Sequence, residues 1–233
     1  MAPPPDPREA DDGLAGEHIH APGALIMDIR LHKGDLPAGL DLGPIVAVDT
    51  ETMGLNPVRD RLCLVQLSAG DGVCHAVQIP RPGADGPAAA PNLTALLTDP
   101  GVTKLFHFAR FDIAILKAHF GVTCAPVYCT KVVSRLVRTF TDRHGLKDLC
   151  RDLLGIELSK QQQSSDWGAP ELTQEQLRYA ASDVVHLHAL KERLDAMLVR
   201  EGRLALAEAC FRFLPTRAEL DLAGWADIDI FQH

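Results

Sequence analysis

The fold is decided by the stretch Ile45-Val46-Ala47-Val48-Asp49-Thr50-Glu51. Its first four residues are apolar, three of them are β-branched, and Gly43-Pro44 precedes them, which predicts a short buried strand. Because side chains alternate along an extended chain, Asp49 and Glu51 point to the same side at the end of that strand. On this motif alone, a polar strand end or an Asp-Thr pair that caps a helix is the plainer interpretation.

The segments around this strand predict a mixed sheet. Residues 62–67 and 73–79 have the pattern of two further strands, and Asn56-Pro57 supplies a turn before them. Beyond a loop at 81–91, we expect strands near 104–106 and 127–129, helices near 92–98, 108–120, 131–139 and 146–154, and one long helix from 174 to about 200. Antiparallel strands followed by alternating helices and strands predict an α/β fold with a mixed sheet and helices on both faces.

Length and composition indicate one domain. The 233 residues, 46% of them apolar, suffice for a single core. Residues 1–26 lack a hydrophobic period, so we expect a disordered tail, or a start at Met27, followed by one domain over 27–233 whose segment 221–233 docks on its own domain or on a neighbouring subunit. No apolar run approaches the ~20 residues that cross a bilayer, and the N-terminus lacks a secretory pattern. We therefore expect a cytoplasmic protein without a membrane partner.

Cysteine usage and charge distribution bear on the kind of partner. The six cysteines are scattered without a Cys-x-x-Cys pair, which indicates reduced core thiols. The net charge of −8 argues against a surface that binds nucleic acid everywhere. Between Lys104 and Lys147, however, eight Lys or Arg residues face only two Asp residues. A local basic surface is therefore expected on an acidic protein.

Two more acids occur on predicted helices. Asp112 lies on the apolar face of its helix, where a carboxylate must be paired, protonated or metal-bound. Tyr179 and Asp183 are four residues apart, so they are neighbours on one helix face. Thr173 and Gln176 form a capping box that marks the start of that helix. Taken singly, Asp112 is better explained by a salt bridge, and the Tyr179 pair by core packing with a surface acid.

The combination points to metal-dependent phosphoryl chemistry. Four carboxylates without obvious basic partners follow one another along the chain, on a strand end and two helices: Asp49, Glu51, Asp112 and Asp183. Such oxygen ligands suit two divalent cations, Mg²⁺ or Mn²⁺. Two ions ~3.5–4 Å apart bind the attacking and the leaving oxygen of an in-line displacement. Tyr179 would orient or deprotonate the attacking water, although a phenol with a pKa of ~10 needs the metals to act as a base.

Three segments resemble the exonuclease motifs of ribonuclease D relatives. They are Val48-Asp49-Thr50-Glu51-Thr52, His107-Phe108-Ala109-Arg110-Phe111-Asp112 and Tyr179-Ala180-Ala181-Ser182-Asp183. Supporting matches are His144-Gly145-Leu146-Lys147-Asp148-Leu149 and Lys160-Gln161-Gln162-Gln163-Ser164-Ser165-Asp166-Trp167. The resemblance implies a ribonuclease H-like sheet and the tyrosine subclass of DEDD-type 3′-5′ exonucleases, with the four acids on the metals. The second motif departs from the family pattern, because Phe108 stands where many relatives carry a polar residue.

The resemblance is closest to the short bacterial nanoRNase C proteins. Thr130-Lys131, residues 141–145 and the tail from Phe213 to Phe231 carry this closer match. It implies an octameric homo-oligomer that hydrolyses very short single-stranded RNA, down to dinucleotides, to nucleoside monophosphates, with DNA as a further substrate. Trimming of longer structured RNA, as in ribonuclease D, is the alternative within the class. An inactive exonuclease fold that only binds nucleic acid is the alternative outside it.

Substrate contacts are expected around the first two motifs. Gly54 permits close approach and Leu55 would wedge against a base, with Thr52 beside them, while a tight turn with a core leucine is equally favoured. His107 would bind a sugar hydroxyl or a phosphate rather than serve only as a satisfied core histidine. Phe111 would stack on a base, although core packing is the commoner state of such a residue.

Further contacts are expected later in the chain. Lys131, Arg135 and Arg138 are spaced as one helical stripe that would contact phosphates, although such stripes are often only solvated faces. Gln163 and Trp167 lie on the loop that precedes the last helix, so both are expected to border the site.

Overall fold

The computed structural model describes residues 27–83, 89–159 and 161–232. The tail predicted for residues 1–26 lies outside this part of the chain. In the described residues no helix is both long and apolar enough to cross a membrane. All six cysteines are free and five of them are buried, which confirms their interpretation as core thiols.

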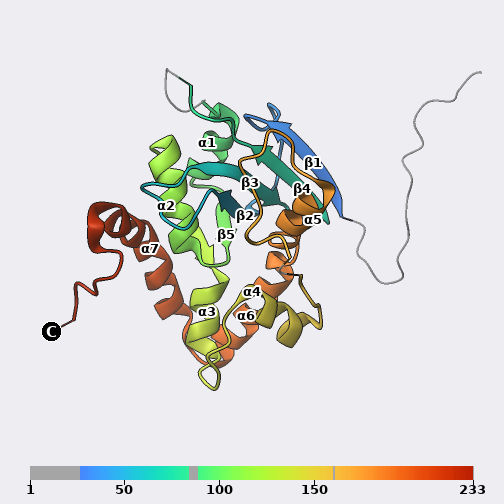
Figure 1. Cartoon of the computed structure of the whole chain (residues 1–233). Helices are drawn as coiled ribbons and strands as arrows, with labels where there is room; N and C mark the ends of the chain where they lie inside the picture. The colour runs from blue at the N-terminus through green and yellow to red at the C-terminus, as the bar shows by residue number, and fades with distance from the viewer. Residues whose placement is uncertain (1–26, 84–88, 160, 233) are drawn as a thin grey trace, which may run out of the picture.

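Within the described residues, six strands form one mixed sheet in the order β1-β4-β3-β2-β5-β6 (Figure 1). β2, β3 and β4 form the predicted antiparallel meander, β5 and β6 extend it in parallel from β2, and β1 adds a parallel edge strand beside β4. The bounds are β1 Asp28–Lys33, β2 Ile45–Thr52, β3 Leu62–Ser68, β4 Val73–Gln78, β5 Thr103–Phe106 and β6 Val127–Cys129. The mixed sheet is confirmed, and β1 is an addition to the predicted strands.

Helices cover both faces of this sheet, as expected from the sequence (Figure 1). α1 (Pro91–Thr98) and α2 (Ala109–Phe120) pack on the face that presents Val46 and Val48, with α7 (Leu204–Leu220) against α2. The opposite face, which presents Ala47, packs against α3 (Thr130–Val137), α5 (Gln174–Ser182) and α6 (Leu187–Arg200). α4 (Leu146–Leu149) continues into the π-helical turn η1 (Cys150–Leu154). The alternation of side chains along β2 thus divides its residues between two cores.

The last predicted helix is interrupted, which corrects the expectation of one helix from 174 to about 200. Its start is as predicted, because Thr173 and Gln176 form both bonds of a capping box. The helix ends at Ser182, whose hydroxyl donates to the Tyr179 carbonyl at 2.6 Å. Such a bond to a preceding carbonyl competes with the helical pattern. The next amides, of Asp183 and Val184, bond three residues back rather than four, and α6 begins only at Leu187.

The C-terminal segment, residues 221–232, is anchored on its own domain at its beginning. It starts with the turn η2 (Asp221–Trp225), and the Arg110 guanidinium of α2 donates to both Asp221 carboxylate oxygens, at 2.5 and 2.7 Å. The apolar side chains that follow are exposed: Trp225, Ile228, Ile230 and Phe231. The first residue of the segment is thus tied to α2, while the apolar side chains of the segment stay largely exposed.

Candidate active site

Three of the predicted acids converge at one end of β2. Asp49 and Glu51 extend from the strand end towards α5, and Asp183 follows the last residue of α5. One carboxylate oxygen from each lies within 4.8 Å of the others. They line a cavity of about 350 Å³ together with Tyr179. The two acids at positions i and i+2 of the strand thus lie close to the acid at the end of the helix.

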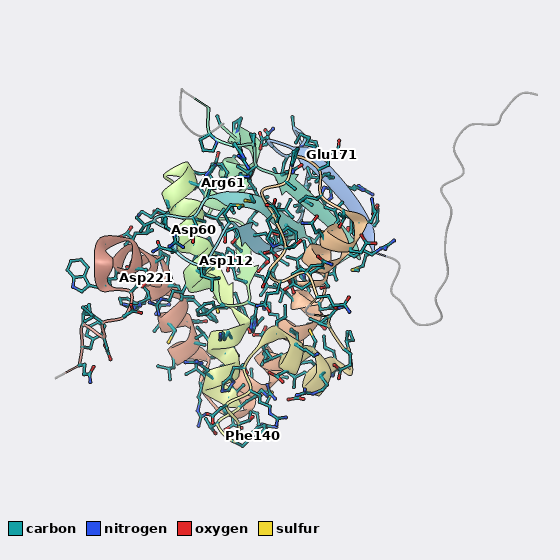
Figure 2. All side chains as sticks on the ribbon, viewed as in Figure 1. Asp60, Arg61, Asp112, Phe140, Glu171 and Asp221 are labelled. Atoms are coloured by element: carbon teal, nitrogen blue, oxygen red, sulfur yellow. The ribbon has the colours of Figure 1, made fainter. Side chains whose placement is uncertain are left out.

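Asp112 approaches the same place from the other side of the sheet. It lies on α2, is only 3% exposed, and accepts a hydrogen bond of 2.7 Å from the Thr50 hydroxyl. Thr50 stands between Asp49 and Glu51 on β2, so its side chain points to the α2 face while the two acids point to the α5 face. Figure 2 shows Asp112 near the middle of the molecule. The end of β2 therefore joins all four acids, although Asp112 is not among the three whose oxygens are closest.

Burial raises the pKa of every one of these acids, and repulsion by neighbouring acids adds to the shift for Glu51, Asp112 and Asp183. Desolvation is the main cause in each case, and it raises the pKa of Asp49 to about 7. The pKa of Glu51 is raised to about 10, by burial and then by the charges of Asp49, Asp183 and Asp112. Burial and the charge of Asp49 also raise the pKa of Asp112 and Asp183. Among the ion pairs of the described residues none includes these acids.

This donor set fits divalent cations of the hard type. It offers only carboxylate oxygens, the ligands that Mg²⁺ and Mn²⁺ prefer, and it contains no thiolate or imidazole. Clustered acids that no ion pair neutralises need either protons or a metal ion. Asp49, Glu51 and Asp183, with Asp112 close by, are therefore the residues that would hold the metal.

Tyr179 lies beside the acids and can donate a hydrogen bond. It is partly buried, lines the cavity, and its pKa is raised by burial and by the charges of Asp183, Glu51 and Asp49. A phenol whose pKa lies above its ordinary value keeps its proton at neutral pH. The Tyr179 hydroxyl can therefore donate a hydrogen bond to an oxygen in the cavity, which favours orientation of a water molecule over its deprotonation.

Most of the predicted substrate residues line the same cavity. Besides the acids, its walls include Thr52, Leu55, His107, Phe111 and Gln163. Leu55 is 88% exposed, so the alternative of a core leucine is wrong and the side chain is free to meet a ligand. Phe111 lines the cavity while it packs at the border of the core.

His107 is held as a neutral hydrogen-bond acceptor. Its Nδ1 lies 2.9 Å from the Thr130 hydroxyl, which in turn donates to the Phe106 carbonyl at 3.2 Å. Because that hydroxyl has one proton, the histidine must donate from Nδ1, and Nε2 is left as the acceptor. Burial and the nearby Lys131 charge lower the pKa of His107 to about 3, so the ring is neutral. Nε2 is therefore suited to accept a hydrogen bond from a sugar hydroxyl.

Four predicted contacts are placed differently. Arg138 follows α3, is 2% exposed, and bonds Asp152 at 2.5 Å and the Arg143 carbonyl, so the prediction of a phosphate contact is wrong. Trp167 is also 2% exposed; it packs behind Tyr179 with ring centres 6.0 Å apart and does not reach the cavity.

Gly54 and Lys131 also have local partners. A Cβ on Gly54 would lie 2.3 Å from the Asp60 carboxylate, so the close approach that requires glycine is to Asp60. The Lys131 ammonium lies 4.0 Å from the centre of the Phe108 ring, a cation–π contact at the start of α3. Neither residue lines the cavity, and the expected basic stripe is reduced to Lys131 and the exposed Arg135.

The residues of one wall of the cavity are not among the predicted substrate contacts. It is formed by the segment before and at the start of α4 and by the following loop: Gly145, Leu146, Lys147, Asp148, Leu158 and Ser159. The signal was present, because residues 144–149 are one of the segments that resemble the family. Lys147 is the cation of this wall and lines the cavity, whereas the residues of the stripe on α3 that the charge pattern favours do not.

The fold and the site together define a DEDD-type exonuclease fold, that is, a ribonuclease H-like mixed sheet with acids converging at a central strand end. A model described as 3′-5′ exonuclease matches residues 35–199. The chain belongs to the 3′-5′ exonuclease family.

Solved structures of two related proteins show how similar this chain is to each of them. NrnC of Brucella melitensis bound to pGG is 56% identical, with a TM-score of 0.84 over 89% of this chain and 99% of that one. The same protein with bound Mg²⁺ is 55% identical, with a TM-score of 0.83 over 89% of this chain and 100% of that one. Escherichia coli RNase D is 26% identical, with a TM-score of 0.65 over 76% of this chain and 45% of that one.

The likeness to full-length ribonucleases D is partial. Ribonuclease D of Acidiphilium cryptum is 41% identical over 161 residues, which are 69% of this chain and 40% of the relative. The chain thus spans about 40% of the length of the curated relatives that it matches.

The raised pKa values predict that the metal-free protein loses stability as pH rises. The folded state binds more protons than the unfolded state between the ordinary carboxyl pKa of ~4 and the raised pKa values of about 7 for Asp49 and about 10 for Glu51. We expect unfolding in urea with EDTA to show a loss on the order of 2–4 kcal/mol from about pH 5 to about pH 8, and Mn²⁺ to reverse it.

The control is a pair of variants. Asp49→Asn with Glu51→Gln should flatten this dependence on pH, whereas Asp142→Asn, which changes an exposed acid outside the site, should leave it unchanged. A wild-type protein whose metal-free stability rises over the same interval would contradict the account.

Proposed function

We propose that this protein is a two-metal 3′-5′ exonuclease that hydrolyses very short single-stranded RNA to nucleoside monophosphates. The observation that carries the proposal is the convergence of Asp49, Glu51 and Asp183, with Asp112 behind them, at one cavity, where no ion pair of the described residues neutralises any of them. A module that only binds nucleic acid would gain nothing from acids that repel phosphate. The Mg²⁺ bound to the similar NrnC supports the choice of metal, and Mn²⁺ suits the same ligands.

In this proposal the metals and the side chains have separate tasks. The ions, when bound, supply the positive charge that stabilises the transition state and makes water a better nucleophile. The four acids hold them, and the protonated Tyr179 hydroxyl orients the attacking water. His107 accepts a hydrogen bond from a sugar hydroxyl through Nε2. A ribose offers an additional 2′-hydroxyl donor, which favours RNA over DNA, although DNA stays a candidate second substrate.

The size and walls of the cavity favour a short substrate. A volume of about 350 Å³ is at the small end of the range for ligand sites, so only a terminal nucleotide is expected to be enclosed. The exposed Leu55 is proposed to separate the terminal base from the next one, and Thr52 and Phe111 line the same cavity. Gln163 and Lys147 line the same cavity and are proposed to contact the substrate. The pGG bound to NrnC supports a short RNA as substrate.

We further propose that the protein works as a cytoplasmic homo-oligomer, octameric as its resemblance to nanoRNase C implies. Free thiols throughout the core are typical of a reducing compartment. The exposed apolar side chains of the C-terminal segment support assembly, since such residues are usually covered in a stable soluble protein. The domain organisation, with one catalytic domain over 27–233, is part of the same proposal.

Activity on a labelled dinucleotide tests the assignment of the site. With Mn²⁺, we expect release of mononucleotides by the wild type and none above background by Asp49→Ala. Tyr179→Phe should lower kcat about 100-fold with little change in KM, because it removes an interaction with the water and not with the substrate. Tyr128→Phe is the matched control, since Tyr128 bonds Asp195 away from the cavity. Wild-type activity that persists in Asp49→Ala would overturn the metal assignment.

The preferred length of the substrate separates the proposal from the trimming of structured RNA. We expect kcat/KM for a dinucleotide to exceed that for a folded RNA of tRNA size, because the enclosed part of the site takes about one nucleotide. Measurement of both with the same preparation and metal decides the question. Equal or better activity on the long RNA would favour the alternative of ribonuclease D-like trimming.

Assembly can be measured without reference to activity. Light scattering coupled to size exclusion should give a particle larger than a dimer for the wild type. Joint replacement of Ile228, Ile230 and Phe231 by Ser should shift the distribution to smaller species if the C-terminal segment is covered in the assembly. A wild type that is monomeric at all accessible concentrations would contradict the proposed oligomer.

A further inference from the structure

A buried glutamine lies beside the acids on the sheet. Gln66 of β3 stands directly opposite Asp49 of β2 and opposite Ala76 of β4. Directly opposed residues of antiparallel strands point to the same face, with Cβ atoms ~4.5–5.5 Å apart. That face is covered by α5, whose Leu177 and Ala180 pack near Ala76. The Gln66 amide is therefore a neighbour of the Asp49 carboxylate, and Gln66 itself does not line the cavity.

The amide of Gln66 has no partner in the described part of the chain. The side chain is 0% exposed, and neither its oxygen Oε1 nor its nitrogen Nε2 is within a hydrogen bond of any described group. An unpaired buried amide is destabilising, whereas an apolar side chain at the same place would not be. On this face Gln66 has Leu64 and Ser68 beside it on β3 and Ala76 and Asp49 opposite it, and the Ser68 hydroxyl is already bonded to the Val73 carbonyl, so Asp49 is the neighbour with oxygens to offer the amide. The Gln66 amide can therefore gain a hydrogen-bond partner only when a neighbouring group at the site changes.

Asp49 is the group that changes. Its carboxylate offers two oxygens with about four sites for hydrogen bonds or metal. The backbone amide of Thr50 is the hydrogen-bond donor recognised for it in the structure. When a cation is held on the cavity side, the oxygen on the sheet side stays available for a further donor. Hydrogen bonds of this kind fix the orientation of metal-binding carboxylates.

We propose that Gln66 is a positioning residue for the metal site. In the metal-bound protein its Nε2 donates a hydrogen bond to the Asp49 carboxylate and fixes the oxygen that faces the cation. The proposal rests on the metal site of the proposed function and adds a residue that lies outside the cavity and outside the three exonuclease motifs. Gln66 would touch neither substrate nor metal, so its effect passes through Asp49 alone.

The test is Gln66→Met, which keeps the length of the side chain and removes the amide. We expect isothermal titration calorimetry to show Mn²⁺ binding weakened by about 10–100-fold, the range for such supporting residues. The rise in Tm on addition of Mn²⁺ should shrink in parallel. The metal-free variant should be as stable as the wild type or more stable, because it no longer buries an unpaired amide. At saturating Mn²⁺, kcat should return to near the wild-type value.

Gln78→Met is the matched control. Gln78 is also buried, on the same face and on the adjacent strand β4, but its amide bonds the Ala169 and Pro170 carbonyls. This variant should lose stability without a change in Mn²⁺ affinity. The contrast separates a weakened core from a weakened metal site.

Two outcomes overturn the proposal. One is a Gln66→Met protein that is more stable than the wild type in EDTA and binds Mn²⁺ equally well, since Gln66 would then be only a core amide. The other is a loss of stability without metal that matches the loss in Gln78→Met. Should Gln66→Met fail to fold, Gln66→Leu takes its place, and failure of both variants to fold would likewise assign Gln66 to the core.

Calorimetry keeps this test apart from the proposed function. A wild type that binds Mn²⁺ but hydrolyses no short RNA would contradict the function and leave the result for Gln66 readable. A wild type that binds no Mn²⁺ would overturn both.

Discussion

The burial of four neighbouring carboxylates, which raises the pKa of each of them, is the constraint on which the rest of the structure depends. A shift of one pKa unit corresponds to about 1.36 kcal/mol, so acids displaced by several units oppose folding by an amount comparable to a sizeable part of a domain's ~5–15 kcal/mol of stability. The site can therefore form only in a fold that other interactions stabilise strongly. When a metal ion binds, the same neighbouring carboxylates become its ligands, and their shared negative charge favours binding.

The sheet supplies that framework. β2 is central, with β3 and β5 as its neighbours, and its Val46, Ala47 and Val48 are 0% exposed. Because successive residues of this strand face opposite cores, one short segment positions Asp49 and Glu51 against α5 and Thr50 against Asp112 of α2. Neither helix alone could bring the acids together. The metal site is thus a property of a strand end fixed from both sides, which is how a rigid first layer of ligands is obtained.

Local patterns in the sequence predict much of this arrangement. The apolar run before Asp49, the alternation of helices and strands after residue 91, and the capping box at Thr173 each depend on neighbours in the chain, and each is found in the structure. The convergence of the acids could be expected from their order and from the resemblance to a family. No local pattern measures the distance between Asp112 and Asp49, whose side chains approach the end of β2 from opposite faces of the sheet.

The differences arise where tertiary contacts decide. Arg138 has the helical spacing of a surface stripe, yet α3 ends at Val137, and the guanidinium turns inward to Asp152. β1 has only two apolar residues, Ile29 and Leu31, with Arg30 between them, a pattern too short to predict a strand, and it is fixed by parallel pairing with β4. Trp167 lies in a polar loop that suggests a surface residue, but its ring is needed behind Tyr179. In the sequence, Gln66 is only one polar residue in an apolar strand. Its place opposite Asp49 follows from the strand pairing.

The interruption between α5 and α6 has a mechanical consequence. A continuous helix would transmit any rotation or shift of its outer half directly to Asp183. With the joint at residues 183–186, the orientation of α5 is set by its capping box and by the packing of Ala180 and Ala181, while α6 is set by Leu190, Leu194 and Leu198. The outer half of the fold is then free to vary in length and packing from one relative to another, or in a redesigned chain, without turning the acid out of register.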